Sequence, residues 1–238
     1  MIRTLFVYVF FATAILFVMP WFILWTILVG NPDLIYSLSM KAFGIATRVL
    51  GIRIRVEGLE NIPPSACIFV SNHASNLDPL VYFPAIPRRI SVMLKKQLMR
   101  IPILSIAMRK AKFVSVDRND RQSAEESFEL VVRHLREGLS FAIFAEGTRS
   151  PDGRLRSFKR GAVLMALQAP VPIVPVSIAG THRLMRKGSR LIQPGDVTIH
   201  FGRAIDAAQF PLDRRNDLLA QVESEVAANL PPDQRPLS

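Results

Sequence analysis

A histidine and an aspartate five residues apart are the first side chains in this sequence with the chemistry for acid–base catalysis. They lie in the segment Ser71-Asn72-His73-Ala74-Ser75-Asn76-Leu77-Asp78-Pro79. A spacing of five residues corresponds to about 500° around a helix, so the two side chains would not share a helical face. The residues between them favour a turn, in which Asp78 would accept a hydrogen bond from one ring nitrogen of His73. The other ring nitrogen, with a reference pKa of about 6.5, would then be free to take a proton from an alcohol.

The same segment also fits a purely structural role. Asp78-Pro79 is a good helix start, with Asp78 as the N-cap and Pro79 in the first turn. His73 would then only satisfy backbone groups in the turn before the helix. Taken by itself, the segment supports the catalytic and the capping interpretations equally.

A second polar segment follows residues 139–144, an apolar run that predicts a strand. Its sequence is Glu146-Gly147-Thr148-Arg149-Ser150. Gly147 permits a ligand to approach the backbone closely, and Arg149 presents a planar fork that matches phosphate. Thr148 and Ser150 add hydroxyl and amide donors. Further basic residues follow at Arg154, Arg156, Lys159 and Arg160. Either a phosphate-binding site or a solvated turn beside exposed charges would explain this segment.

Both polar segments begin where a predicted strand ends, in a chain whose strand-like and helix-like patterns alternate. The candidate strands are residues 52–57, 67–71, 90–94, 112–116, 139–144, 173–178 and 197–201, and the candidate helices are residues 34–50, 123–136, 158–167 and 213–228. This alternation predicts an α/β domain with a mixed, largely buried β-sheet flanked by helices. Because ligand sites in such folds gather at the carboxyl ends of strands, we expect the two polar segments to face one site.

The amino terminus is strongly apolar. Residues 5–29 contain no charged side chain, and as a helix they would be roughly 37 Å long, enough to cross a hydrocarbon core. Trp21 and Trp25, the only tryptophans, suit a headgroup boundary. The run is too long for a signal peptide, and no small-residue cleavage site follows it. Two alternatives remain: a single transmembrane helix, or a pair of helices broken at Pro20 that enters one leaflet and returns.

These patterns predict three regions. Residues 1–50 form a membrane-associated segment with a hydrophobic helix and an amphipathic helix, residues 51–230 form the catalytic domain, and residues 231–238 form a flexible tail. Arg3 is the only basic residue before the apolar run, whereas several basic residues follow it closely, at Lys41, Arg48, Arg53 and Arg55. The positive-inside bias therefore predicts a membrane-associated protein whose catalytic domain faces the cytoplasm.

Composition narrows the class of partners and chemistry. The chain has 30 Lys and Arg against 19 Asp and Glu, a net charge of +11, which favours anionic partners. Many aromatic residues cluster in the apolar run rather than among the basic ones, which argues against a nucleic-acid-binding surface. The single cysteine, Cys67, excludes an intrachain disulfide and reads as an inert buried thiol. The sequence contains neither a metal-ligand spacing nor the Gly-x-Ser-x-Gly motif of a serine hydrolase.

Taken together, the two polar segments resemble the first and third motifs of the glycerolipid acyltransferases, with the greatest similarity to 1-acyl-sn-glycerol-3-phosphate acyltransferases. Segments similar to the second and fourth motifs and to a shared basic run are also present: Lys96-Gln97-Leu98 with Ile101-Pro102 and Phe113-Val114-Ser115-Val116-Asp117-Arg118; Val171-Pro172-Ile173-Val174-Pro175-Val176; and Phe158-Lys159-Arg160-Gly161. The resemblance covers about residues 52–201. Gln97 and Ser105 depart from the Glu and Gly that the family often has there.

The resemblance implies a division of labour among these residues. His73 removes the proton of the acceptor hydroxyl and Asp78 orients the imidazole, while the hydroxyl attacks an acyl-CoA or acyl-carrier-protein thioester directly. The acceptor phosphate would be held by the third motif and by two helpers, namely Glu146, Gly147, Thr148, Arg149 and Ser150 with Arg118 and Lys159. No metal or other cofactor is required, and the expected partners are a lysophospholipid, the acyl donor and the bilayer, not nucleic acid.

The expected reaction is transfer of a fatty acyl group to the free sn-2 hydroxyl of 1-acyl-glycerol-3-phosphate, which yields phosphatidic acid for phospholipid biosynthesis. Another lysolipid acceptor, such as a lyso-aminolipid or another lysophospholipid, is the alternative. An acceptor without phosphate would need Arg149 less.

Overall fold

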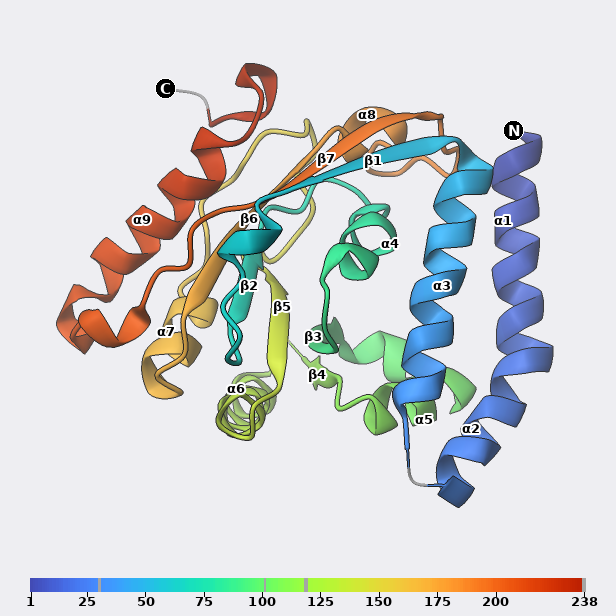
Figure 1. Ribbon diagram of the computed structural model, residues 1–238, viewed down its shortest axis with the longest axis horizontal. Helices are drawn as coiled ribbons and strands as arrows, with labels where there is room; N and C mark the ends of the chain where they lie inside the picture. The colour runs from blue at the N-terminus through green and yellow to red at the C-terminus, as the bar shows by residue number, and fades with distance from the viewer. Residues whose placement is uncertain (30, 101, 118–119, 237–238) are drawn as a thin grey trace.

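The computed structural model describes residues 1–29, 31–100, 102–117 and 120–236, and its centre is a seven-stranded sheet (Figure 1). The strands lie in the order β1-β7-β6-β2-β5-β3-β4. Neighbours are parallel except β6 and β7, which are antiparallel, so the predicted mixed sheet is confirmed. The bounds are β1 Ile52–Glu57, β2 Ile68–Ser71, β3 Ile90–Lys95, β4 Val114–Val116, β5 Ser140–Phe144, β6 Ile173–Ala179 and β7 Gly195–Phe201.

Helices cover both faces of this sheet. Their bounds are α1 Ile2–Thr13, α2 Met19–Val29, α3 Asp33–Leu50, α4 Asp78–Tyr82, α5 Pro102–Lys110, α6 Arg121–Arg136, α7 Gly161–Gln168, α8 Thr181–Leu184 and α9 Arg215–Ala228. Helices α6, α7 and α9 pack on one face, and α3 and α4 pack on the other (Figure 1). Side chains alternate along a strand. Ile68 and Val70 of β2 therefore pack in the core beneath α6, α7 and α9, whereas Phe69 packs in the core beneath α3 and α4.

The predicted elements differ from the observed ones mainly at their ends and in three short helices. The strand predicted to begin at residue 112 begins at Val114, because Lys112 has a φ of 60° and terminates the preceding turn. Helices α4, α5 and α8 were not predicted as elements, although Asp78-Pro79 was recognised as a helix start. Helix α6 begins at Arg121 because the carboxylate of Asp120 accepts hydrogen bonds from Gln122 N and Ser123 N.

The apolar amino terminus forms one continuous helical run, so the alternative of two helices separated at Pro20 is wrong. A π-helical segment, Ala14–Val18, joins α1 to α2, and Met19 N donates to Ala14 O across it. Pro20 lacks an N–H group, and its ring would crowd the carbonyl four residues earlier in an α-helix. The wider π turn accommodates this residue without ending the helix. The chain reverses later, between Val29 and Asp33, and α3 returns antiparallel (Figure 1).

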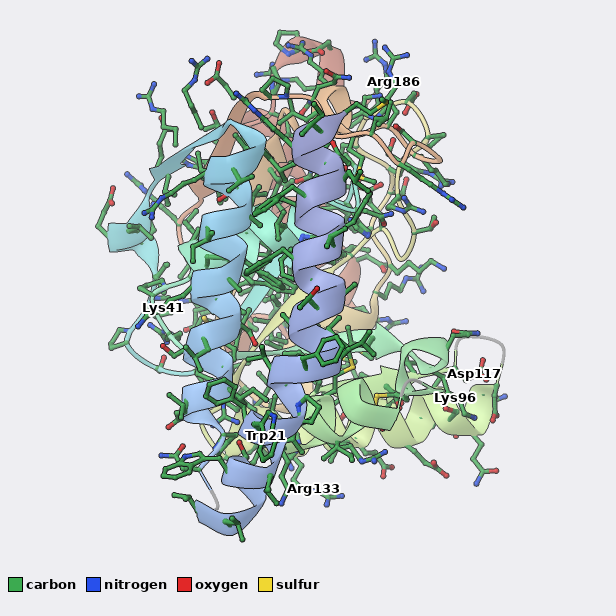
Figure 2. The ribbon with its side chains drawn as sticks, turned by 90° about the vertical axis from the view of Figure 1, so that its right-hand side faces the viewer. Trp21, Lys41, Lys96, Asp117, Arg133 and Arg186 are labelled. Atoms are coloured by element: carbon green, nitrogen blue, oxygen red, sulfur yellow. The ribbon has the colours of Figure 1, made fainter. Side chains whose placement is uncertain are left out.

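The helical run packs along the domain at both of its ends. Near its start, Thr4 and Ile192 exchange two hydrogen bonds, of 3.3 and 3.2 Å, and Tyr8 Oη donates to Arg190 O over 2.9 Å. Near its end, Ile23 joins Ile35 of α3 in a small apolar cluster with neighbours from α2 and α5. Ile2–Thr26 is long and apolar enough to cross a membrane, and most of its side chains are exposed (Figure 2).

The described part of the carboxyl terminus is held in place, in contrast to the predicted flexible tail at residues 231–238. Leu155 N donates to Gln234 O over 2.8 Å, and the Gln234 side chain is buried. Arg183 pairs with Asp233, and Arg235 Nε donates to Leu230 O over 2.8 Å. The first of these contacts joins the segment to the loop that follows the third motif and the second joins it to α8, while residues 237–238 lie outside the described residues.

Candidate active site

The turn between β2 and α4 brings His73 and Asp78 together, as predicted. His73 Nδ1 lies 2.8 Å from Asp78 Oδ2, and Ala74 N and Ser75 N donate to the same oxygen over 2.8 and 2.9 Å. An ionised carboxylate only accepts hydrogen bonds, so Nδ1 carries the hydrogen and Nε2 is left as the acceptor. In the described part of the chain, Nε2 has no hydrogen-bond partner, and the His73 side chain is 19% exposed whereas Asp78 is fully buried.

Asp78 begins α4 but is not its N-cap, so the predicted capping role is wrong and the predicted pairing with His73 is present. Asp78 is the first residue of the helix, Pro79 follows it in the first turn, and Leu77 occupies the N-cap position. The Asp78 carboxylate turns back to the preceding loop rather than to the helix. The helix start therefore fixes the carboxylate that orients the imidazole.

Three further residues position this turn without having been predicted individually. The amide of Asn72 pairs with the backbone of Ile178 in β6, with Nδ2 donating over 2.9 Å and Oδ1 accepting over 2.8 Å. Ser75 Oγ donates to Met185 O over 2.7 Å. Phe144, the last residue of β5, stacks on the His73 ring at 4.1 Å between centroids and 19° between planes. Asn72 lies inside the recognised motif, but nothing in the sequence indicates its partner 106 residues away.

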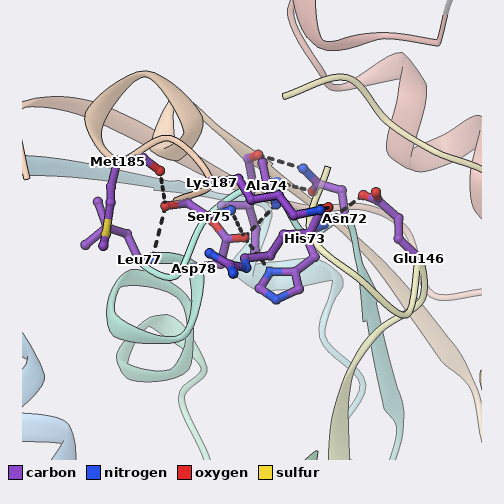
Figure 3. Close-up of polar contacts among 11 residues, drawn as sticks. Asn72, His73, Ala74, Ser75, Leu77, Asp78, Glu146, Met185 and Lys187 are labelled. Carbon is purple, nitrogen blue, oxygen red and sulfur yellow. Dashed lines mark hydrogen bonds and ion pairs between the residues drawn. The ribbon is translucent and has the colours of Figure 1, made fainter. Parts of the chain in front are cut away.

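The third motif holds both backbone polar groups of His73. Glu146 Oε1 accepts a hydrogen bond from His73 N over 2.8 Å, and Ser150 N donates to His73 O over 2.8 Å (Figure 3). Glu146 is 4% exposed and Ser150 is fully buried, with its hydroxyl donating to Asp152 inside the turn. These two residues therefore lie behind His73, where they support it, rather than on the accessible surface of the site.

Burial gives Glu146 an unusual protonation behaviour. Desolvation raises the pKa of its carboxyl to about 7, and the nearby Asp78 charge acts in the same direction. The hydrogen bond from His73 N and the charge and backbone N–H of Arg156 oppose this shift. At neutral pH, the carboxyl that accepts from the His73 backbone is therefore divided between its neutral and charged forms.

The other third-motif residues face outward. Gly147 has a φ of 73°, a backbone conformation that favours glycine. A Cβ there would lie 3.0 Å from Lys159 Cε, so a larger residue would have to displace the Lys159 side chain. Thr148 and Lys159 are exposed and Arg149 is half-buried. Among the described residues, the Arg149 guanidinium has no hydrogen-bond or carboxylate partner. Arg118, the other predicted helper, lies outside the described residues.

Neither a metal centre nor a reactive thiol is found in the described part of the chain. No group of three or more His, Cys, Asp or Glu side chains in it is arranged to hold a metal ion. Cys67 is fully buried, and burial raises the pKa of its thiol to about 11. A thiol in that state is a poor nucleophile at neutral pH.

Comparison with known proteins places these residues in a family context. The sequence profile described as Acyltransferase matches residues 53–179. The chain is 34% identical over 195 residues to the 1-acyl-sn-glycerol-3-phosphate acyltransferase of Limnanthes douglasii, covering 82% of this chain and 69% of that protein. For the enzyme of the same name from Borreliella burgdorferi, the identity is 30% over 187 residues, with 78% and 75% covered.

A solved structure has the same fold. The crystal structure of the 1-acyl-sn-glycerophosphate (LPA) acyltransferase PlsC from Thermotoga maritima superposes with a TM-score of 0.79 at 29% sequence identity. The alignment covers 94% of this chain and 92% of that one.

Proposed function

The chain belongs to the acyltransferase family, and we propose that His73 is the general base with which it acylates the free sn-2 hydroxyl of 1-acyl-glycerol-3-phosphate. The enzyme is of the 1-acylglycerol-3-phosphate O-acyltransferase type, and its product is phosphatidic acid. The observation that carries the mechanism is the His73–Asp78 pair, in which Nδ1 is used by a buried carboxylate and Nε2 is left to accept a proton.

The chemical step follows from this arrangement. Nε2 takes the hydroxyl proton while the hydroxyl oxygen attacks the carbonyl carbon of the thioester, and a tetrahedral intermediate forms. The intermediate then expels the thiolate, which receives the proton from the imidazolium. Asp78 stabilises the imidazolium and holds the ring in orientation, and the stacked ring of Phe144 restrains it further. No acyl-enzyme is required.

Arg149 is the proposed ligand of the acceptor phosphate. It directly precedes Ser150, whose N–H is bonded to His73 O, and Glu146 of the same motif accepts from His73 N, so two hydrogen bonds join the segments of the cation and the base. In 1-acyl-glycerol-3-phosphate, the phosphate and the reacting hydroxyl are on neighbouring carbons, so the cation and the base must act close to each other. Gly147, Thr148 and Lys159 line the same outward side, and Arg118 is the further candidate.

The acyl donor is a thioester of coenzyme A or of acyl-carrier protein. Both are anionic, and the net charge of +11 favours their approach to this protein. Neither donor requires a cofactor. The net charge does not distinguish the coenzyme A donor from the acyl-carrier-protein donor, so a purified assay must compare them.

The amino-terminal helices attach the enzyme to one leaflet of the membrane. The helix contacts the domain at both of its ends, which favours binding along the membrane surface over crossing the bilayer. The exposed apolar side chains of α1 and α2, including Trp21 at 72% exposure, would instead enter the leaflet side-on. The proposed orientation has the domain on the cytoplasmic face, which the basic residues after the run favour.

Labelling at the two ends of the helical run tests this placement. Ile2→Cys and Asn31→Cys are each treated, in sealed vesicles, with a thiol reagent that does not cross membranes, while the buried Cys67 serves as internal background. Side-on binding predicts that both cysteines react from the same side. Reaction from opposite sides would show that the run spans the bilayer.

A purified assay tests the function itself. Acyl-CoA and acyl-carrier-protein donors are each combined with 1-acyl-glycerol-3-phosphate and with other lysolipids, and the products are identified by mass spectrometry. We expect phosphatidic acid formation to have the highest kcat/KM. A faster reaction with an acceptor that lacks an exposed phosphate would exclude the phosphate-binding role of Arg149.

A further inference from the structure

The loop of residues 185–194, between α8 and β7, lies outside all the recognised motifs. It contacts both the turn that carries His73 and the third motif. Gln193 N donates to Leu184 O over 2.9 Å and closes the base of the loop. A turn at its tip, with Ser189 N donating to Arg186 O over 3.0 Å, includes Gly188 at a φ of 90°. The loop therefore has a defined shape set by its own backbone.

Two contacts from this loop reach the catalytic segments. Met185 O accepts the hydroxyl hydrogen of Ser75, in the turn that carries His73, and Lys187 Nζ donates to Arg149 O over 3.0 Å. Figure 3 shows Met185 and Lys187 approaching the turn from the same side, opposite Glu146. One loop thus braces the base segment with a carbonyl and the phosphate segment with a cation.

The contact leaves most of the Lys187 ammonium free to bind a ligand. An ammonium group has three donors, and one of them is used by Arg149 O. The residue is exposed, and no carboxylate among the described residues pairs with it. Arg183, just before the loop, differs in this respect because it is paired with Asp233.

We propose that Lys187 is part of the acceptor phosphate site, where it binds a phosphate oxygen together with Arg149 and fixes the backbone that carries Arg149. The proposal rests on the phosphate-binding role of Arg149 proposed above. Two cations from separate segments would grip one phosphate from two directions, which a single guanidinium cannot do.

The loop is also fastened to the amino-terminal helix, which explains how a cation on a loop is kept in position. Tyr8 Oη donates to Arg190 O, and Thr4 pairs with both backbone groups of Ile192. The phosphate of a lysolipid lies at the membrane surface, where the apolar helix is expected to bind. An element attached to that helix is suited to meet the phosphate there.

The test compares three variants of the full-length enzyme in vesicles of fixed lipid composition. Lys187→Gln should raise the KM for 1-acyl-glycerol-3-phosphate about tenfold, with kcat and the donor KM changed less than about threefold. Lys187→Arg should restore most of the affinity because it keeps the charge and a donor. Arg186→Gln removes the same charge one residue earlier, from a side chain that points into solvent (Figure 2), and should leave all three constants nearly unchanged.

Arg149→Gln, measured in the same assay, distinguishes failure of the phosphate site at Arg149 from failure of the role proposed for Lys187. An acceptor KM raised by Arg149→Gln but not by Lys187→Gln would overturn the role of Lys187 and leave the proposed function standing. An acceptor KM that neither variant changes would exclude a phosphate site at Arg149 and Lys187. A fall in kcat alone in Lys187→Gln, accompanied by a lower melting temperature, would reduce Lys187 to a structural brace and overturn its binding role.

Discussion

The two halves of the site differ in how firmly the protein holds them. The base half is largely buried and rich in hydrogen bonds: Asp78 Oδ2 receives three donors, and both backbone groups of His73 are bonded to the third motif, while Asp78 Oδ1 and Glu146 Oε2 have no partner among the described residues. The phosphate half consists of Arg149, Lys159 and Lys187, which are half-buried or exposed and use few of their donors within the protein. The base half is preorganised for a proton transfer that tolerates little misplacement, whereas the phosphate half leaves its charges free for a ligand.

This difference predicts opposite kinetic signatures. Changes in the base half should lower kcat, because they affect a group that acts in the transition state. Changes in the phosphate half should mainly raise the acceptor KM, because they affect binding of the ground state and the transition state alike.

The largest effect is expected from His73→Ala. Loss of the general base should lower kcat by about 10²- to 10⁴-fold with little change in the acceptor KM. The measurement is initial-rate kinetics with saturating donor, with circular dichroism to confirm the fold. His134→Ala, at a half-buried histidine of α6 that pairs with Glu137, is the control, and its kcat should be nearly normal. A near-normal rate in His73→Ala would exclude the proposed base.

Asp78→Asn should have the next largest effect, a fall in kcat of roughly 10²-fold or more. The amide keeps the shape of the carboxylate but removes the charge that stabilises the imidazolium. Its NH₂ group can also donate to Nδ1, which would favour the tautomer with the hydrogen on Nε2. Since three donors meet at Asp78 Oδ2, a lower melting temperature should accompany the kinetic loss. Retention of full kcat would show that Asp78 only begins the helix.

Arg149→Gln should raise the acceptor KM about tenfold while kcat falls less than about threefold. The guanidinium lacks a partner among the described residues, so its removal leaves no carboxylate unpaired, and we expect little loss of stability. Thermal unfolding measured alongside the kinetics checks this point. A loss confined to kcat would show that Arg149 acts with the base half, and would contradict the predicted difference between the two halves.

Glu146 should make stability depend on pH in a specific direction. Its pKa is raised from 4.5 to about 7 in the folded protein, so between these values the folded state binds a proton that the unfolded state has lost. The contribution is therefore present below about pH 4.5 and is lost as the pH rises to about 7. The melting temperature relative to Glu146→Gln should fall by roughly 5 °C across this window. Parallel pH profiles of the two proteins would show that Glu146 does not titrate there.

The smallest effect is expected from Thr4→Val, which removes both hydrogen bonds to Ile192 at nearly constant volume. A loosened loop should raise the acceptor KM about twofold through Lys187, with the fraction of enzyme bound to vesicles unchanged. Thr47→Val, whose hydroxyl bonds only within α3, is the control. An equal response of the two variants would show that the loop is not coupled to α1.

The amino-acid pattern alone predicts the strands, helices α3, α6, α7 and α9, and the turn that joins His73 to Asp78. These features depend on side-chain periodicity and on turn chemistry over a few residues, which a single segment contains in full. It also determined the apolar character of the amino terminus. It left open whether the helix continues through Pro20, because no residue pattern here predicts the π turn that makes this possible.

Only the tertiary structure decided which distant groups meet at the site. The strand order β6-β2-β5 brings Asn72 next to Ile178 and His73 next to Glu146 and Ser150. The loop contacts of Met185 to Ser75 and of Lys187 to Arg149 span 110 and 38 residues. Their partners are backbone carbonyls, which every residue possesses, so side-chain type carries no information about them. The position of a carbonyl in space depends on how the whole sheet is assembled.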